Sequence, residues 1–251
     1  MGISRAAIKT DAKQAMRQAK PSVFLVTLVY LLIGLILEYL SLKVTGQYRL
    51  LQQTLEAFAE GEMYFSRVLP YTSTMADLIS LALSIMTMMI GVGFTIYSLN
   101  ISRRVSAGYG NLFDGFAIFF KVLWLHILMG VFIFLWSLLL IIPGIVATYR
   151  YRQALYIMLD NPDMTALECI RASKRMMMGR KWELFVLDLS FIGWGMLSII
   201  PFVVLWTLPY AEVTYANYYN ALAHMPGGAD FDGWHGGSGE GGRGERPPWE
   251  H

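Results

Sequence analysis

Four charged side chains lie within or near apolar segments of the sequence, where an ionisable group requires a partner. They are Arg150 and Arg152 in one segment, Asp188 in the next and Glu212 in the last. A charge at the centre of a bilayer costs at least about 2.5 kcal/mol, so such residues indicate a functional path or a paired structural site. Counted along the predicted helices, Arg150 falls at the level of Glu212, and Arg152 at the level of Asp188. These four residues form the candidate intramembrane polar cluster.

Two roles fit this cluster. The residues could line a polar path or a binding cavity, as in a small transporter or channel that uses intramembrane charges. Alternatively, two ion pairs could fix how the last three helices pack, with each charge satisfied by its partner. The sequence favours the structural role. His126, in another apolar segment, is better explained as a packed or snorkelling side chain than as a ligand.

The sequence lacks the patterns that indicate catalysis or metal binding. Its four histidines show no pairing at the spacing of four residues that a helical metal site uses. The single cysteine, Cys169, excludes an internal disulfide framework and a cysteine-rich metal site. The motifs GxSxG, GxxxxGK[ST] and HExxH are absent. We therefore expect a non-enzymatic protein with no catalytic residues, no cofactor and no metal.

The composition is that of a membrane protein. Hydrophobic residues make up 55% of the chain and charged residues 15%, against roughly 25% charged in soluble domains. Residues 78–99 contain no charge, and at about 1.5 Å per residue they are long enough to cross a hydrocarbon core of roughly 30 Å. The net charge of +2 gives no reason to expect a nucleic-acid partner.

The apolar segments predict an all-α fold, a polytopic membrane helix bundle with about six transmembrane helices in hairpins. Residues 1–225 are expected to form a single integral membrane domain, and the glycine-rich residues 226–251 a disordered cytoplasmic tail. The positive-inside rule places the basic clusters, and with them both termini, on the cytoplasmic side of the plasma membrane. A rival topology has four crossings, with residues 144–159 at the interface. The six predicted helices span about 22–40, 77–99, 119–142, 144–159, 183–206 and 207–223.

Two amphipathic helices are predicted at the cytoplasmic interface. Residues 3–20 predict a helix with one apolar face and one basic face, which begins after a potential N-cap at Ser4. Its basic face would contact anionic lipid headgroups. Residues 163–179 begin after Asn161 and include a potential capping box of Thr165 and Glu168. The second helix would lie on the inner leaflet or dock a protein. Its basic residues form the candidate cytoplasmic basic surface: Arg171, Lys174, Arg175, Arg180 and Lys181.

Glycines inside the apolar segments predict close contacts between helices or kinks rather than ligand sites. They form two pairs, at 91 and 93 and at 193 and 195. The loop between the first two membrane helices contains a further amphipathic pattern at 50–58, which predicts a short helix that could cap the bundle.

A series of short motifs in the second half of the chain resembles a bacterial multipass membrane family known as domain of unknown function 975. More distantly, the chain is similar to the membrane domain that accompanies some glycerophosphodiester phosphodiesterases, whose chemistry resides in a separate soluble domain. The resemblance implies a helical membrane fold, but no activity and no site residues. It rests on IIPGI at 141–145, LDNPD at 159–163, ALECI at 166–170, SKRMMMGRK at 173–181, LSFIGW at 189–194 and the later pairs at 209–210 and 218–219.

These observations predict an integral membrane protein of uncharacterised role. We expect it to bind membrane lipids, in particular anionic ones, or a partner protein at its cytoplasmic face. The basic amphipathic helices and the lack of catalytic patterns favour this function over transport.

Overall fold

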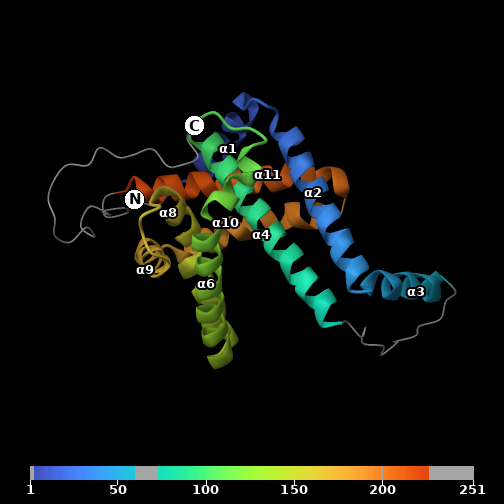
Figure 1. Cartoon of the computed structure of the whole chain (residues 1–251). Coiled ribbons are helices and arrows are strands. Elements are labelled where there is room, and N and C mark those ends of the chain that lie inside the picture. Colours follow the sequence, from blue (N-terminus) through green and yellow to red (C-terminus); the bar gives the residue numbers. More distant parts are fainter. Residues whose placement is uncertain (1–2, 60–72, 199, 226–251) are drawn as a thin grey trace.

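The computed structural model describes residues 3–59, 73–198 and 200–225, and every regular element within these ranges is a helix. The predicted all-α fold is therefore confirmed for this part of the chain, whereas the predicted tail at 226–251 lies outside the described residues. Figure 1 shows the arrangement. In chain order the helices are α1 (Arg5–Gln18), α2 (Val23–Val44), α3 (Gln47–Ala59), α4 (Thr74–Ser102), α5 (Asn111–Asp114), the 3-10 helix η1 (Gly115–Ile118), α6 (Phe119–Leu139), α7 (Ile141–Tyr151), α8 (Ala154–Asp160), α9 (Ala166–Met176), α10 (Lys181–Leu197) and α11 (Pro201–Ala223).

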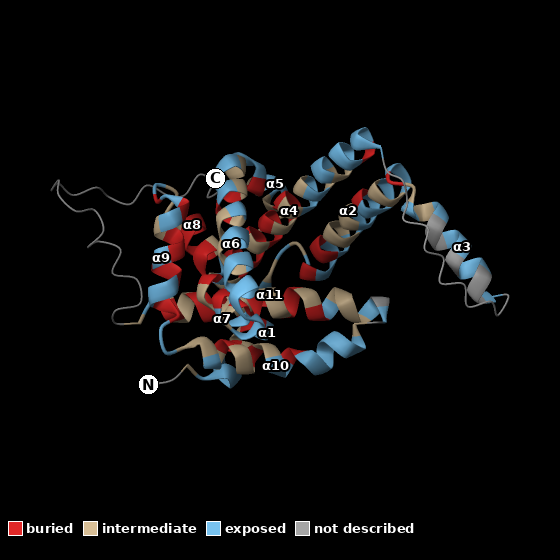
Figure 2. Ribbon diagram, turned by 90° about the horizontal axis from the view of Figure 1, so that it is seen from below, coloured by how far each residue is buried: buried red, intermediate tan, exposed pale blue. Residues whose placement is uncertain are grey.

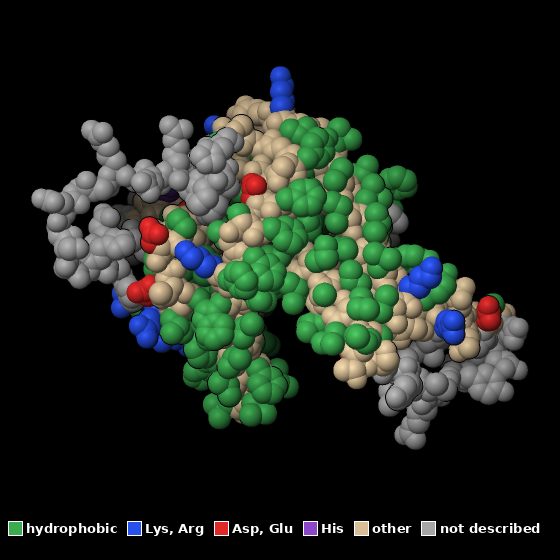
Figure 3. Space-filling view, viewed as in Figure 1, with side chains coloured by type: hydrophobic (Ala, Val, Ile, Leu, Met, Phe, Trp, Pro, Cys, Tyr) green, Lys and Arg blue, Asp and Glu red, His purple; other side chains and the backbone are tan. Residues whose placement is uncertain are grey.

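Among the described residues, three helical segments are long and apolar enough to cross a membrane. They are Val23–Val44, Thr74–Ser102 and Asn111–Leu139, the last of which joins α5, η1 and α6. Only 11% of the most apolar stretch of the third segment is buried inside the protein, so most of its side chains face outward. Figure 3 shows hydrophobic side chains covering the outward surfaces of α2, α4 and α6. The chain thus has the features of a membrane protein. The predicted number of six crossings is not confirmed.

Helices α2 and α4 pack side by side and antiparallel. Tyr30 stacks on Phe94 near one end, with ring centroids 4.5 Å apart, and the Ser41 and Ser80 hydroxyls are hydrogen-bonded at 3.3 Å near the other. The end at which α2 begins and α4 ends is called the basic end here, and the other is called the opposite end. The basic end is named for three residues that flank it: Lys20, Arg103 and Arg104.

The fold-back of α5 and η1 onto α4 depends on two glycines. A Cβ atom at Gly93 would lie 2.0 Å from the carbonyl oxygen of Leu112, and one at Gly115 would lie 2.5 Å from that of Met89. A side chain at either position would collide with backbone. The predicted close contact is confirmed at Gly93. No close contact forms at the two glycines inside α10, where an added Cβ meets no atom within 4 Å, and the alternative of a kink there stays a prediction.

Helices α6 and α7 form the tight hairpin that the sequence predicted. Leu140 interrupts the helix with an extended backbone, and Gly144 then packs against Ser137, where an added Cβ would lie 2.1 Å from Oγ. The predicted single helix at 144–159 is in fact two, α7 and α8, which are separated at Arg152 and Gln153.

The last two helices differ from the prediction in where they begin and how they lie. The predicted bounds 183–206 and 207–223 are wrong, because α10 ends at Leu197 and α11 begins at Pro201, a position where the missing N–H of proline costs nothing. Pro209 lies inside α11. Both Figure 1 and Figure 2 show α11 running across α6 rather than alongside it.

Helix α1 begins after the predicted N-cap, Ser4, and its apolar face packs on other helices. The Ser4 hydroxyl accepts a hydrogen bond from the Ala7 amide at 3.4 Å and caps the helix. Its apolar face, including Ile8, Ala12 and Met16, is buried against α11 and α4. Helices α11 and α4 thus supply the surface that covers the apolar face of α1, and the expected contact of its basic face with anionic headgroups stays a prediction.

Helix α9 is likewise amphipathic, and its apolar face packs on α6, α7 and α8. The capping box of Thr165 and Glu168 is present, so the helix begins at Ala166 and the predicted start at 163 is too early. Gly179, with φ of 76°, ends the segment in a conformation that favours glycine. Cys169, Ile170 and Ser173 on this face are buried within the chain, whereas the expected position of the exposed basic face on the inner leaflet stays a prediction.

Candidate functional site

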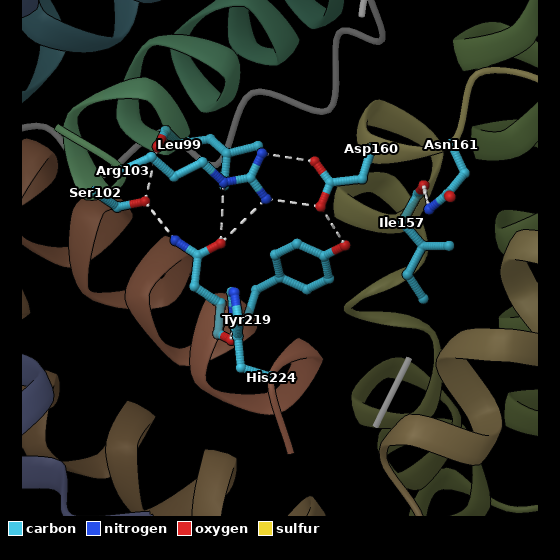
Figure 4. A network of polar contacts seen from close by, with 9 residues as sticks. Leu99, Ser102, Arg103, Ile157, Asp160, Asn161, Tyr219 and His224 are labelled. Atoms are coloured by element: carbon cyan, nitrogen blue, oxygen red, sulfur yellow. Dashed lines mark hydrogen bonds and ion pairs between the residues drawn. The ribbon is translucent and has the colours of Figure 1, made fainter. Parts of the chain in front are cut away.

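A hydrogen-bonded ion pair joins α4, α8 and α11 at the basic end (Figure 4). The Arg103 guanidinium donates to both oxygens of Asp160, with distances of 2.8 Å from Nη1 and 2.7 Å from Nη2. The Tyr219 hydroxyl donates to Asp160 Oδ2 at 2.7 Å, and the Asn220 side-chain oxygen accepts from Arg103 Nε and Nη2. Bidentate pairing gives this contact both strength and fixed geometry. The network holds three helix ends together.

A second set of contacts fixes α1 to the same end. Arg104, which has a positive φ of 58°, forms an ion pair with Asp11 at 2.9 Å. The Asn217 amide nitrogen donates to Asp11 Oδ2 at 3.1 Å and to the Ile8 carbonyl oxygen at 3.3 Å. Polar contacts at the basic end therefore connect α1, α4, α8 and α11, and we call this set of contacts the joint.

The structure brings Arg152 and Asp188 together, as the depth count predicted. Their closest N–O distance is 3.7 Å, and the Arg152 guanidinium also lies over the ring of Tyr215, 4.6 Å from its centroid. Asp188 accepts hydrogen bonds from the Tyr149 hydroxyl at 2.9 Å and from the Tyr215 hydroxyl at 2.7 Å. Arg152, directly after α7, and three side chains of α7, α10 and α11 thus satisfy one another's charges and hydrogen bonds.

The other predicted pair does not form. Glu212 is half-buried and lies in the electrostatic field of Arg152, and no ion pair joins it to Arg150 in the described part of the chain. The backbone of Arg150 has a structural role, since its carbonyl oxygen accepts a hydrogen bond from Ser173 at 2.8 Å. The intramembrane cluster is therefore centred on one arginine, with Asp188 as its ion-pair partner.

The basic side chains of α9 point away from the protein. Arg171 and Lys174 are exposed on the face opposite the buried one, and Leu167, one turn before Arg171, is exposed on the same side. Figure 3 shows Lys and Arg side chains near the position of α9, beyond the hydrophobic surface. Arg180 pairs with Glu183 at 3.7 Å. In the predicted basic surface, Arg171 and Lys174 are thus exposed, whereas Arg180 forms an ion pair. Arg175 is exposed as well, and Lys181 is half-buried.

An apolar groove runs beside this basic surface. Its cavity has a volume of about 520 Å³, within the roughly 300–1,000 Å³ typical of small-molecule sites. Lys121 stands at its rim and donates to the carbonyl oxygen of Pro162. Leu167 lines the groove and connects it to Arg171 one helical turn away. The apolar lining residues are Phe120, Trp124, Met158, Met164, Ala166 and Leu167.

Other candidate positions have ordinary structural surroundings. His126 packs in α6, where its Nδ1 lies 2.9 Å from the Val122 carbonyl oxygen. Burial, with a smaller contribution from the charge of Glu168, raises the pKa of the Cys169 thiol to about 12. Among the described residues, no three His, Cys, Asp or Glu side chains are grouped so that they could hold a metal ion.

In its described part the chain is all-helical, with long apolar helices and polar contacts between them. A family described as a protein of unknown function (DUF975) matches the chain over residues 137–225. The resemblance noted in the sequence is thereby confirmed for the part from α7 to α11. No curated protein and no solved structure matches the chain.

The joint at the basic end was missed by the sequence analysis, although a signal for it existed. Arg103 follows the apolar run of α4, and Asp160 ends the returning segment α7–α8. Two opposite charges at the same predicted side of neighbouring helices indicate a contact. Tyr219 and Asn220 carried no comparable signal, because the rotation of α11 is decided by packing.

Proposed function

We propose that this chain is a multipass integral membrane protein without enzymatic activity that binds anionic phospholipid at its cytoplasmic face. The observation that carries the proposal is the position of Arg171 next to the apolar groove. The groove offers space for an acyl chain, and Arg171 and Lys174 offer positive charge for a phosphate-bearing headgroup. A phospholipid is the ligand whose two parts match these two surfaces.

The orientation follows from the basic residues. Lys20, Arg103 and Arg104 lie at the basic end, and the groove lies between the first turns of α6 and the start of α9, near the same end. The positive-inside rule assigns this end to the cytoplasm. The location in the plasma membrane is part of the same proposal.

The experiment is native mass spectrometry of the purified protein titrated with phosphatidylglycerol or phosphatidylcholine of the same acyl chains. We expect more bound phosphatidylglycerol than phosphatidylcholine. Arg171→Gln and Lys174→Gln should each weaken the binding of phosphatidylglycerol about fivefold, since a cation near an anionic surface contributes about 1 kcal/mol. Binding of phosphatidylcholine should not change.

Further variants separate the contribution of the lipid headgroup to binding from that of the acyl chain. Trp124→Ala removes part of the groove wall and should weaken the binding of both lipids equally. Lys43→Gln and Arg49→Gln, made singly, each remove one charge at the opposite end and should change the binding of neither lipid. If phosphatidylglycerol binding is lost only in the Lys43 or Arg49 variant, or is unchanged in the Arg171 and Lys174 variants, the proposed site is wrong. A protein retained in place of lipid would favour a partner-binding function.

Transport through the intramembrane cluster is the alternative function, and its support is weaker. Arg152 and Asp188 are paired with each other and with two tyrosines, which is the arrangement of a structural contact. A transport site would need these groups to exchange partners with a substrate.

A further inference from the structure

The tip of the α10–α11 hairpin lies at the basic end of the bundle. Trp206, in the second turn of α11, stacks on Phe24 with ring centroids 5.2 Å apart. Phe24 is the second residue of α2, a helix of 22 residues and thus about 33 Å long. A hairpin that crossed the membrane from the basic end would bring its tip close to the last turns of α2 instead.

Contacts with α1 fix the level of the rest of the hairpin. Lys9 donates to the Ser190 hydroxyl at 2.6 Å and lies over the ring of Phe191, 4.3 Å from its centroid. Lys13 lies over the Tyr210 ring in the same way, at 5.4 Å. The middles of both α10 and α11 therefore lie at the level of α1.

Helix α1 cannot enter the hydrocarbon core. It carries five charged residues in 14, and each charge at the centre of a bilayer costs at least about 2.5 kcal/mol. Burial, followed by the charges of Lys13 and Arg5, lowers the pKa of Lys9, but four further charged groups remain on the helix. Since α1 stays at the interface, the helices beneath it stay near the interface as well. The charged residues of α1 are Arg5, Lys9, Asp11, Lys13 and Arg17.

The side of α10 that faces away from α1 is apolar and uncovered. Leu189, Ile192 and Met196 recur at spacings of three and four residues, and their exposed fractions are 52%, 54% and 71%. Phe202 in α11 is 82% exposed. Through the stack of Trp206 on Phe24, this surface continues into the outward face of α2.

We propose that α10 and α11 form an in-plane hairpin, embedded in the leaflet at the basic end, whose apolar side contacts lipid acyl chains. Its polar side contacts α1 and the headgroup region. The chain would then cross the membrane four times, with α2, α4, α6 and the returning α7–α8 segment. Lipid is the occupant of the apolar side because that side is continuous with the exposed face of α2, which is itself long and apolar enough to cross.

Spin labels measure this arrangement directly. Single cysteines replace Leu189 and Met196 in the full chain carrying Cys169→Ala, reconstituted in vesicles of phosphatidylcholine and phosphatidylglycerol. The accessibility of each nitroxide to oxygen and to a water-soluble nickel chelate gives its depth. An in-plane hairpin places both labels at the same depth. A crossing hairpin separates them by about 10 Å, since they are seven residues apart.

Labelling from one side of sealed vesicles gives a second readout that does not depend on absolute orientation. A maleimide that cannot cross the membrane is added on the side from which Gln53→Cys, on α3, reacts. We expect Phe202→Cys to remain unlabelled there and to react after detergent is added. Equal depth together with this protection supports the proposal. Unequal depth, or reaction of Phe202→Cys from the same side as Gln53→Cys, overturns it.

The proposed lipid site on α9 does not depend on this inference. Arg171→Gln should leave the depths at 189 and 196 unchanged, so the two proposals fail separately.

Discussion

Arg103 and Asp160 form a bidentate ion pair that connects the C-cap residue of α4 to the last residue of α8. The two side chains retain 30% and 22% exposure, so the pair is partly shielded from water. Tyr219 and Asn220 from α11 complete its hydrogen bonds. Three helices that are distant in the sequence thus share one contact, and its loss should loosen all three.

The first prediction concerns this pair. Asp160→Asn should lower the free energy of unfolding by about 1.5–3 kcal/mol, the contribution typical of hydrogen bonds to a charged group. Arg103→Lys should be nearly as damaging, because an ammonium cannot make the bidentate contact. The measurement is the midpoint of thermal unfolding in detergent. Glu56→Gln on α3 is the matched control and should leave the midpoint unchanged. Equal midpoints for Asp160→Asn and the control would contradict the prediction.

The second prediction concerns the role of the intramembrane cluster. Asp188→Asn leaves Arg152 without its partner and should destabilise the protein by about 1–3 kcal/mol. The double variant Arg152→Gln with Asp188→Asn should lose less than the sum of the two single variants, because the charges act as a pair. Thermal unfolding of the four proteins gives the coupling energy. Additive losses would show that the ion pair contributes no stability of its own.

The third prediction concerns the glycines that bring α5 and η1 against α4. Gly93→Ala should prevent this packing, since the added methyl group would lie 2.0 Å from a backbone oxygen. Gly130→Ala, in an exposed part of α6 with no atom near the added Cβ, should be neutral or stabilising by up to about 1 kcal/mol. The yield of monodisperse protein after extraction compares the two. Normal yield and stability of Gly93→Ala would refute the close contact.

The fourth prediction concerns Cys169. Because burial raises its pKa to about 12, the thiol stays protonated at neutral pH, and the thiolate that reacts with maleimide is scarce. Its fully buried position also excludes the reagent. We expect no labelling of the folded protein and complete labelling after denaturation, as measured by intact mass. Rapid labelling of the folded protein would show that α9 detaches from the bundle.

The fifth prediction concerns the start of α9. Thr165→Ala removes the N-cap and should cost about 1 kcal/mol, whereas Thr165→Ser keeps the hydroxyl and should be close to neutral. Hydrogen exchange across Ala166–Met176 measures the difference locally. If both variants exchange at the same rate as the original chain, the capping box does not stabilise this helix.

Local sequence patterns predicted most of the helices and some of their ends. The long apolar runs indicated α2, α4 and α6, because a helix of such length and composition is determined by its own residues. Ser4, Thr165 and Glu168 predicted caps that the structure confirms, since a cap acts within the first turn of a helix. The pairing of Arg152 with Asp188 was also predicted, because opposite charges in neighbouring apolar segments need partners.

Only the tertiary structure decided how the helices face one another. The apolar stripes of α1 and α9 were evident in the sequence, but a stripe is equally satisfied by lipid and by another helix, and here helices cover both. The failure of Arg150 to pair with Glu212 has the same origin, because a depth count does not give the rotation of a helix about its axis. The sequence by itself determined an all-helical, lipid-compatible chain. The contact of Trp206 with Phe24, and with it the course of the last hairpin, depended on packing between residues about 180 positions apart.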